Sequence, residues 1–351
     1  MAEVLIIGLG AAGCLLANAF AARGVAVWGA DDPEGWAASE MAPGIINPLA
    51  GKKLRPGPCL KQELVAASEA YCQIEQKIGG KVFHPTPLLR ILRTEKQAKL
   101  FDGGDWSEER VEWVGERYRP GAFGGMIDDR FGSFLTRQSG WVDAQQMRVG
   151  IANELRRSGR FIAEKISSKE VFPERDGVRC RGKKWDLVVF CEGWKGAINS
   201  WFPEVVFNSA KGQVLELQCE GGDPGWEWIL NHDKWLQPRG GGRYRAGSTF
   251  RWDEFDELVT AESRKEIEDG IRRCFPGFPF RVVNQLGGVR PVVVDYQPVA
   301  GCHREWRGLG VLNGLGSRGL LVGPLIAKRF VEYLIDGNKL PEQVSIERFY
   351  Q

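Results

Sequence analysis

A cluster of glycines near the start of this 351-residue chain constrains its fold more than any other feature. Gly8, Gly10 and Gly13 form a G-x-G-x-x-G motif between the apolar block at residues 4–7 and an alanine- and leucine-rich stretch that ends near residue 22. This order predicts a strand, a tight turn and a helix. The first glycine allows the turn, the second admits a pyrophosphate, and the third lets the helix pack on the strand. The motif therefore predicts a dinucleotide-binding site.

The acidic residue that such a site uses follows at a suitable distance. A second apolar run at residues 25–28 predicts the next strand, and Asp31 is the first acidic residue after it, with Asp32 beside it. The first helical residues, including Ala11 and Ala12, would present backbone N–H groups to the phosphates. Asp31, or else Asp32, would accept hydrogen bonds from ribose hydroxyls, which disfavours NADP. The competing interpretation is a tight strand-to-helix turn that binds no ligand.

The same region raises the question of a membrane segment. Residues 4–22 carry no charge, and on length alone such a run suits a membrane helix or a signal peptide. The chain begins Met-Ala-Glu without a basic region, and the run divides into a strand-like and a helix-like half, so we expect neither. Eight widely spaced cysteines without a C-x-x-C pair favour reduced thiols and a cytoplasmic location. The net charge of +2 disfavours a nucleic-acid-binding tail.

Residues 39–48, Ser-Glu-Met-Ala-Pro-Gly-Ile-Ile-Asn-Pro, distinguish FAD from NAD. They closely follow the second predicted strand and resemble the loop that wraps the flavin in the D-amino acid oxidase (DAO) family of FAD-dependent oxidoreductases, which includes glycine and sarcosine oxidases. The resemblance continues along the chain through separated motifs in the family's order. It implies non-covalently bound FAD, with contacts from Ser39, Ala42, Gly44 and Ile45.

The resemblance also implies an α/β fold with two interleaved domains. A Rossmann-like FAD-binding domain, with a parallel sheet of the GR2 type, would comprise residues 1–56, 140–210 and 286–351. An α+β substrate domain built on an antiparallel sheet would comprise residues 57–139 and 211–285.

Two further segments resemble parts of the family's cofactor domain. Residues 140–143, Gly-Trp-Val-Asp, resemble the return into that domain, and residues 185–193 resemble its second glycine-terminated strand. This strand ends Cys191-Glu192-Gly193, whereas the family usually has a small residue before the glycine, so the contacts of the Cys and Glu side chains stay open. The cofactor residues implied here are Ile166, Cys191, Gly193 and Trp194.

Residues 287–291, Gly-Gly-Val-Arg-Pro, are similar to the family segment whose arginine holds the substrate carboxylate. Arginine suits this role because its planar, permanently charged guanidinium can donate two parallel hydrogen bonds to a carboxylate. Arg290 is therefore the expected catalytic residue. The alternative is a structural arginine in a partly buried ion pair.

The last motif, residues 314–320, follows a strand-like run and precedes an apolar stretch that predicts a helix to about residue 335. In the family this helix directs its N-terminus at the flavin pyrimidine ring, where its partial positive charge stabilises the anionic reduced flavin. The cofactor contacts implied here are Gly314, Gly316, Ser317, Arg318, Gly319 and Leu320.

These residues predict an FAD-dependent amine or amino acid oxidase or dehydrogenase. The resemblance implies oxidation of the C–N bond of a small amino acid or secondary amine that carries a carboxylate, by hydride transfer to flavin N5. Other chemistries lack their motifs. The three histidines, His84, His232 and His303, have no zinc-site spacing, and the chain has neither a G-x-S-x-G elbow nor a P-loop.

Three different functions stay open beside this one. Residues 39–55 and 314–320 are most similar to the flavin domain of the bifunctional enzyme that finishes 5-methylaminomethyl-2-thiouridine in tRNA, which implies oxidative removal of a carboxymethyl group from a modified base. The near-neutral charge favours a small-molecule amine over a tRNA partner. The second function is that of a flavin-binding electron-transfer or sensor protein without amine turnover, and the third is that of an NAD dehydrogenase.

The remaining expectations concern structure. The Arg-Gly-Gly-Gly-Arg segment at 239–243 predicts a glycine hairpin rather than an RNA-binding element, and the lysine-rich region at 61–100 is expected to be helical and solvent-facing. Cys302 is the first cysteine to check for a covalent flavin link, although we favour a buried free thiol. Four tryptophans are expected to pack an antiparallel sheet rather than line a pocket: Trp226, Trp228, Trp235 and Trp252.

Overall fold

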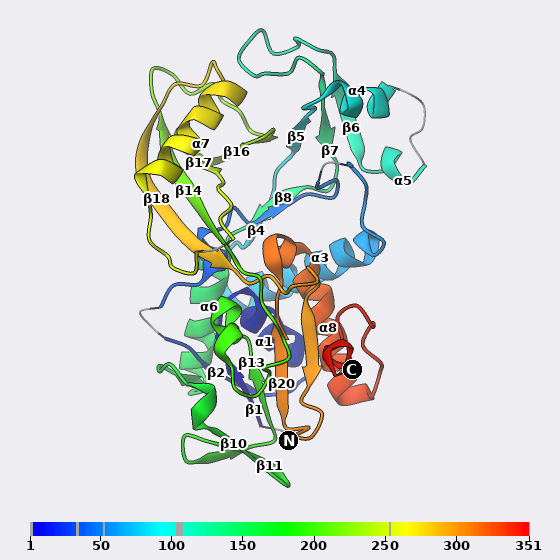
Figure 1. Cartoon of the computed structure of the whole chain (residues 1–351), viewed down its shortest axis with the longest axis vertical. Coiled ribbons are helices and arrows are strands. Elements are labelled where there is room, and N and C mark those ends of the chain that lie inside the picture. Colours follow the sequence, from blue (N-terminus) through cyan, green and yellow to red (C-terminus); the bar gives the residue numbers. More distant parts are fainter. Residues whose placement is uncertain (1–2, 33–34, 52, 103–107, 253, 351) are drawn as a thin grey trace.

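Two large sheets organise the computed structural model, which describes residues 3–32, 35–51, 53–102, 108–252 and 254–350. One sheet forms the half of the molecule that carries the N-terminus, and the other forms the opposite half (Figure 1). Lys52 lies outside the described residues. It belongs to the segment 39–55, whose sequence is similar to part of the flavin domain of a tRNA-modifying enzyme.

The first sheet has six strands, and its neighbours pair in parallel except β19, which is antiparallel to β20. Each residue of its central strand β1 is buried, because both faces of the sheet are covered. In spatial order the strands are β19 (Val299–Cys302), β20 (Leu309–Asn313), β13 (Leu187–Phe190), β1 (Val4–Ile7), β2 (Val27–Ala30) and β9 (Phe161–Ile162).

The two faces of this sheet have different covers. Val4 and Ile6 pack with the helices, whereas Leu5 and Ile7 pack on the other side with Trp185 and its neighbours. The helices are α1 (Ala11–Ala22), α3 (Leu60–Ile78), α6 (Ala144–Arg157) and α8 (Gly319–Asp336). The opposite cover is a three-stranded sheet of β10 (Val171–Glu174), β11 (Gly177–Cys180) and β12 (Lys183–Trp185).

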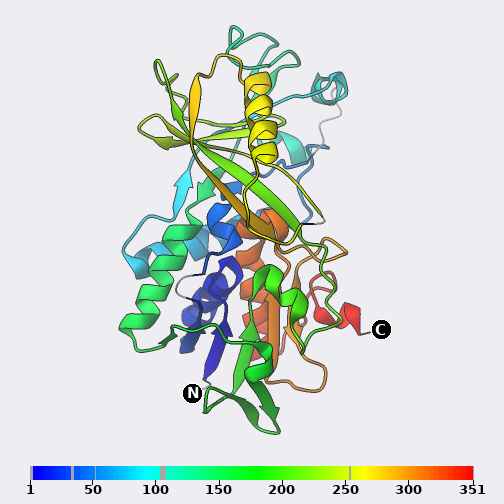
Figure 2. The same cartoon turned by 60° about the vertical axis from the view of Figure 1, so that its left-hand side comes forward.

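The second large sheet has eight strands, and most of its neighbours are antiparallel. Helix α7 (Ala261–Cys274) packs on it through Ile267, Ile271 and Cys274 (Figure 2). In spatial order its strands are β18 (Phe280–Arg290), β14 (Ala210–Cys219), β17 (Arg243–Gly247), β16 (Trp235–Gly240), β15 (Ile229–Asn231), β5 (Leu88–Ile91), β7 (Ser133–Thr136) and β6 (Val114–Tyr118).

The remaining elements are short. A three-stranded sheet consists of β3 (Ile45–Ile46), β8 (Gly140–Val142) and β4 (Phe83–Pro85). The short helices are α2 (Ala38–Met41), α4 (Glu95–Asp102) and α5 (Glu108–Val111), with 3₁₀ turns η1 (Ser168–Glu170), η2 (Gly193–Ile198), η3 (Gly316–Arg318) and η4 (Ile346–Phe349). No helix in the described part of the chain is long and apolar enough to cross a membrane.

The predicted fold class is confirmed, since a Rossmann-like parallel sheet carries helices and a second, largely antiparallel sheet accompanies it. The domain boundaries stay a prediction. Strand β18 (Phe280–Arg290) runs without interruption across the expected boundary at residue 286.

The expectation for residues 61–100 is wrong in part. Helix α3 and helix α4 are present, but the region also contains β5, whose four residues are all buried in the interior of the eight-stranded sheet. Helix α3 is itself amphipathic and buries Tyr71 and Ile74. The lysine content of the whole region therefore led to a wrong expectation. It reflects the exposed positions and gives no sign of the apolar face of α3 or of the short buried strand β5.

Of the smaller expectations, the glycine hairpin is confirmed, and the packing role of the four tryptophans is confirmed for two of them. Gly240, Gly241 and Gly242 all have positive φ angles and connect β16 to β17 as a hairpin. Trp226 stacks on Phe278 with ring centroids 5.7 Å apart, and Trp228 lies in a cluster of aromatic rings against the same sheet. These rings contribute to packing, as expected.

The tight packing of α1 on the turn that follows β1 predicts how a substitution at Gly13 changes the stability of the fold. A Cβ at Gly13 would lie 1.9 Å from the carbonyl oxygen of Gly8, so Gly13→Ala must push the helix away from the turn. We expect a loss of about 2 kcal/mol in unfolding free energy, more than the ~1 kcal/mol that alanine gains in a helix. Gly10→Ala is the control, because its Cβ would meet only the Cβ of Ala37, at 3.7 Å. Equal urea midpoints for the two variants would contradict this packing.

Candidate active site

A cavity of about 700 Å³ lies at the carboxyl ends of the parallel strands and continues to the eight-stranded sheet. Ligands of open α/β sheets bind at this edge, because the strand-to-helix turns meet there. The predicted residues that line the cavity are Gly8, Gly10, Ala11, Ala12, Asp31, Asp32, Ser39, Ala42, Gly44, Ile45, Ile166, Cys191, Gly193, Trp194, Arg290, Gly316, Ser317, Arg318, Gly319 and Leu320.

Two predicted cofactor residues do not line the cavity. Gly13 supports packing of α1 on the turn, as the close approach to Gly8 shows. Gly314 has a φ of +70°, and a Cβ there would lie 2.5 Å from a methyl group of Val293. It therefore turns the chain between β20 and α8, and the direct cofactor contact expected of it stays a prediction.

The part of the cavity next to Gly8, Gly10 and the N-terminus of α1 fits a dinucleotide. Gly8 has a φ of +92°, and a Cβ there would lie 2.5 Å from the carbonyl oxygen of Cys191, so only glycine brings the backbone this close. A Cβ at Gly10 would meet only the Cβ of Ala37, at 3.7 Å. The N-cap residues of α1 and α8, Gly10 and Arg318, make no side-chain capping hydrogen bond, which leaves both helix N-termini available for anionic or polar groups of a ligand.

Asp31 is held by an arginine from α6. The Nε and Nη2 groups of Arg148 donate to Oδ2 of Asp31 at 3.0 and 2.8 Å, and Nη1 lies 3.4 Å from the Glu40 carboxylate. Within the described chain, Oδ1 of Asp31 has no hydrogen-bond partner. One carboxylate oxygen therefore orients the side chain, and the other is available for ribose hydroxyls. The position of Arg148 was not predicted, because it is far from Asp31 in sequence.

The structure answers the open question about the Cys191 and Glu192 side chains. Both line the cavity, and burial raises the pKa of each. The pKa of Glu192 rises to about 7, although Asn199 donates a 2.6 Å hydrogen bond to Oε2, which partly opposes the shift. A carboxyl group that is half protonated near neutral pH can act as a hydrogen-bond donor to a ligand.

Arg290 is not in an ion pair. Its guanidinium lies 4.0 Å from the centre of the Phe250 ring and donates to Oγ of Ser248 at 3.1 Å and to the carbonyl oxygen of Thr249 at 3.4 Å. No carboxylate in the described chain lies within ion-pair distance, and burial lowers its pKa to about 10. This position of the guanidinium depends on a glycine opposite, because a Cβ at Gly212 would lie 2.1 Å from Nη1.

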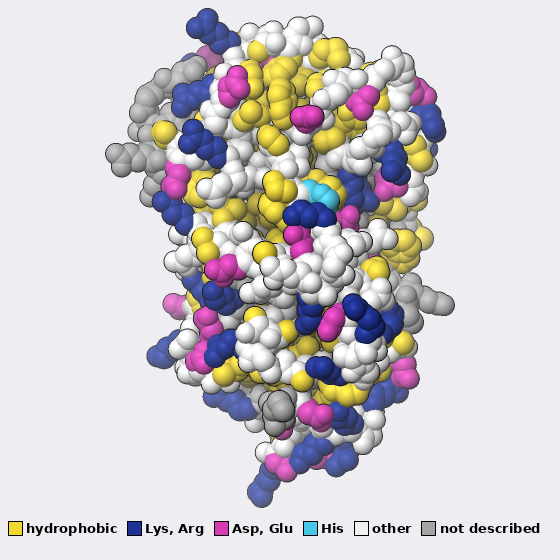
Figure 3. Space-filling model, turned by 180° about the vertical axis from the view of Figure 1, so that it is seen from behind, with side chains coloured by type: hydrophobic (Ala, Val, Ile, Leu, Met, Phe, Trp, Pro, Cys, Tyr) yellow, Lys and Arg dark blue, Asp and Glu magenta, His cyan; other side chains and the backbone are white. Residues whose placement is uncertain are grey.

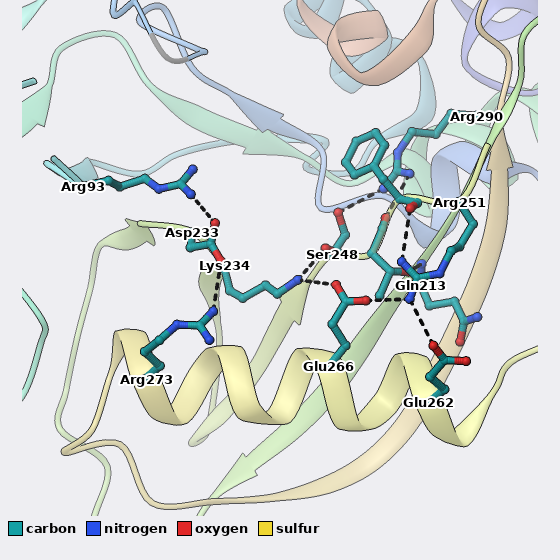
Figure 4. A network of polar contacts seen from close by, with 12 residues as sticks. Arg93, Gln213, Asp233, Lys234, Ser248, Arg251, Glu262, Glu266, Arg273 and Arg290 are labelled. Atoms are coloured by element: carbon teal, nitrogen blue, oxygen red, sulfur yellow. Dashed lines mark hydrogen bonds and ion pairs between the residues drawn. The ribbon is translucent and has the colours of Figure 1, made fainter. Parts of the chain in front are cut away.

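A polar network supports this arginine (Figure 4). The buried Nζ of Lys234 donates to the carbonyl oxygen of Ser248 at 3.0 Å and to Glu266 at 2.9 Å. The other oxygen of Glu266 accepts a 2.7 Å hydrogen bond from Arg251. Lys234 and Arg251, which both line the cavity, thus pair with Glu266, and Arg251 also lies 3.8 Å from Glu262. Arg290, in contrast, has no carboxylate partner in the described chain.

Several residues that line the cavity were not predicted. Trp235 was expected to pack and instead lines the cavity, whereas Trp252 lies partly exposed beside Phe250. The others of note are Lys165, Asn231, Asp233, Lys234, Ser248, Arg251 and Glu266. They come from the end of β15, from loops and from α7, for which the sequence contains no local motif.

Cys302 does not line the cavity. It is buried in β19, and burial raises its thiol pKa to about 12. This placement agrees with a buried free thiol and gives no support to a flavin link at Cys302. In the described chain no group of three or more His, Cys, Asp and Glu side chains is placed to hold a metal ion.

A glycine-lined cavity at the carboxyl ends of a Rossmann-like parallel sheet is typical of one class of protein, the dinucleotide-binding oxidoreductases. The sequence model that represents the DAO family, described as FAD dependent oxidoreductase, matches residues 3–333. The chain therefore belongs to this family, and FAD is its cofactor. The predicted family, enzyme class and cofactor are confirmed.

The relatives agree with this assignment. The tRNA 5-methylaminomethyl-2-thiouridine biosynthesis bifunctional protein MnmC of Marinobacter nauticus is 28% identical over 386 residues, which cover 99% of this chain and 58% of the relative. The chain thus spans a little over half the length of that relative. Glycine oxidase from Geobacillus kaustophilus has a TM-score of 0.78 at 19% identity, with 97% of this chain and 96% of that chain covered.

A second solved structure has the same degree of similarity. Iminodiacetate oxidase from Chelativorans sp. BNC1 has a TM-score of 0.78 at 21% identity, with 99% of this chain and 98% of that chain covered. At these identities, the two structural likenesses show a shared fold.

Gly10 provides a test of the cofactor site that is separate from folding. Alanine there is compatible with the protein, because its Cβ has only one contact, at 3.7 Å. The methyl group would instead occupy space where the backbone must approach a pyrophosphate. We expect Gly10→Ala to weaken FAD binding at least about tenfold, measured by titrating flavin-free protein with FAD and following flavin fluorescence. Unchanged affinity would place the pyrophosphate elsewhere.

Glu192 predicts a pH dependence of stability. Its folded-state pKa of about 7 is above the ordinary value of 4.5. The protonated carboxyl group therefore contributes fully to the unfolding free energy at acidic pH, and this contribution is lost as pH rises through about 7. Glu192→Gln should remove this loss. We therefore expect the unfolding free energy of flavin-free wild type to fall, relative to the variant, by on the order of 2 kcal/mol between about pH 5 and pH 8. The exposed Glu305 offers a control substitution to Gln, and parallel pH profiles for wild type and Glu192→Gln would refute the shift.

Proposed function

We propose that this protein oxidises the C–N bond of a small amino acid or secondary amine that carries a carboxylate. The observation that supports this most directly is the partly buried guanidinium of Arg290, which has no carboxylate partner in the described chain and lines the same cavity as the cofactor residues. An unpaired cation that is largely removed from water is costly. A carboxylate on the substrate would remove that cost and would be bound at a defined position.

The proposed roles of the residues follow from their contacts. When bound, the flavin would supply the acceptor for the two electrons that leave with the hydrogen of the substrate α-carbon as the C–N bond is oxidised to C=N. Arg290 binds the carboxylate and orients the α-carbon, Ser248 and Phe250 fix the guanidinium, and Trp235 contributes apolar surface that limits access of water. The residues that line the described cavity include no histidine, and Glu266 is engaged by two cations. We therefore propose that the substrate amine reacts in its neutral form, after losing its proton to solvent.

A modified base in tRNA is the second candidate substrate, because the relative from Marinobacter nauticus is named for tRNA modification and matches 99% of this chain. Such a substrate would also be a secondary amine with a carboxylate, so Arg290 would keep its role. The surface offers less support. Positive and negative side chains are interspersed on the face shown in Figure 3, whereas phosphate binding uses clustered Lys and Arg.

Substitution of Arg290 tests the main proposal. The flavin absorbance of the anaerobic protein should bleach on addition of one member of a panel of glycine, N-methylglycine, D-amino acids and proline. Arg290→Gln should raise the concentration needed for half-maximal bleaching at least about 100-fold, because it removes a charge-assisted, two-point contact. Stability should not fall, because the substitution removes an unpaired buried charge.

Arg281 provides the matched control. It also lies on β18, but it is exposed, outside the cavity and 3.7 Å from Glu220, so Arg281→Gln should leave bleaching unchanged. If free amines fail and tRNA bearing the carboxymethylaminomethyl base bleaches the flavin, the second candidate replaces the first. A flavin that none of these compounds reduces would contradict both.

A further inference from the structure

A second arginine near the cavity lacks a counter-ion. Arg90 lies on β5 and is buried, with 6% of its surface exposed. Its Nη1 donates to Oδ1 of Asn231, its Nη2 donates to the carbonyl oxygen of Gly51 at 3.3 Å, and its Nε has no partner. No carboxylate of the described chain lies within ion-pair distance of it, and burial lowers its pKa to about 10.

The acids near this end of the cavity are paired with other cations. Asp233 accepts hydrogen bonds from Arg93 and, at 3.1 Å, from Arg273 (Figure 4). Glu266 accepts from Lys234 and Arg251. In the described chain, Arg90 and Arg290 are therefore two arginines next to the eight-stranded sheet that have no carboxylate partner.

Arg90 determines how Asn231 presents its side chain. A guanidinium has donors only, so the amide oxygen of Asn231 must face it, and this contact settles an orientation that is otherwise ambiguous for an asparagine. Asn231 lines the cavity, and its Nδ2 has no hydrogen-bond partner in the described chain. Its two N–H groups are thus available to an acceptor on a ligand, with the charge of Arg90 behind them.

The sheet register places Asn231 at a useful distance from Arg290. Asn231 pairs with Trp235 on β16, and Trp235 pairs with Gly247 on β17, next to the Ser248 that holds the Arg290 guanidinium. Two strand spacings, about 10 Å, separate Asn231 from that end of β17. An extended secondary amine with a carboxylate at each end, hydrogen-bonded at both ends, spans a comparable length.

We infer that Asn231, oriented by Arg90, binds a second carboxylate of the substrate, and that the substrate class is therefore a secondary amine with two carboxylates. Arg290 binds one carboxylate and Asn231 the other, with the amine and the reacting carbon between them. This inference rests on the proposed function, because it assigns the first carboxylate to Arg290. It makes Asn231 a specificity-determining residue and Arg90 the residue that positions it.

Binding of unreactive ligands tests the inference without depending on turnover. Diglycolate is a dicarboxylate in which an ether oxygen replaces the amine, and methoxyacetate is the matching monocarboxylate. By isothermal titration calorimetry of the FAD-loaded protein, we expect diglycolate to bind at least about tenfold more tightly, as a hydrogen bond to a charged group predicts. The monoamide of diglycolate separates the effect of charge from that of a neutral carbonyl and should bind more weakly than the dicarboxylate.

Asn231→Asp is the informative variant, because the new carboxylate can still accept from Arg90 while it removes the donor and repels a second carboxylate. Diglycolate affinity should fall at least about tenfold and methoxyacetate affinity less than about threefold. Asn153→Asp is the matched control, since Oδ1 of Asn153 also accepts from an arginine, Arg156 at 3.0 Å, but outside this cavity.

Each other outcome overturns the inference. Equal affinity of the dicarboxylate and the monocarboxylate, no binding of diglycolate, or an unchanged ratio in Asn231→Asp would show that Asn231 binds no second carboxylate. Monoamide binding as tight as that of diglycolate would exclude the dicarboxylate class. The proposed function is judged separately by flavin bleaching with amines, so a failure of the inference can be told apart from a failure of the proposed function.

Discussion

The unpaired charge of Arg290 determines which residues the neighbouring strands of the eight-stranded sheet place around it. The guanidinium lies where a side chain at Gly212 would be, so β14 must have a glycine there. Phe250 contacts its face, and Ser248 accepts one of its hydrogens. These contacts are weaker than an ion pair and leave the charge uncompensated, which is a cost to the empty protein. Under the proposed function, the same cost becomes affinity when a substrate carboxylate binds.

The cofactor side of the cavity meets the opposite requirement, because it must accept negative charge without adding much positive charge from side chains. Backbone groups provide most of the complementarity there. The N-termini of α1 and α8 have no side-chain caps, and Gly8 and Gly10 keep the backbone accessible. The two acids differ in how they are accommodated: Asp31 is paired with Arg148, whereas Glu192 has a raised pKa. Neither therefore opposes a bound phosphate with a full, unscreened negative charge.

The cofactor site could be predicted from the sequence because each of its parts is a local motif at a strand end. Nearly all of the residues implied for it line one cavity, and the exceptions, Gly13 and Gly314, are glycines needed for packing and for a turn. The substrate side could not be predicted in the same way. Lys234, Ser248 and Glu266 come from two turns and a helix, and they meet only because strand pairing brings these segments together. The buried strand β5 was missed because the lysines around it dominate the composition.

One segment connects the two sides. Helix α2 (Ala38–Met41) includes the predicted cofactor residue Ser39, and Glu40 within it is bound from both halves of the molecule. Its carboxylate lies 3.4 Å from Arg148 of α6, while its carbonyl oxygen accepts a 3.0 Å hydrogen bond from Arg245 of β17. Arg245 is itself paired with Glu216 of β14, the strand that carries Gly212. Glu40 therefore connects the segment that carries Ser39 to the sheet that holds Arg290. Through these contacts both halves of the molecule fix the position of α2 relative to Arg290.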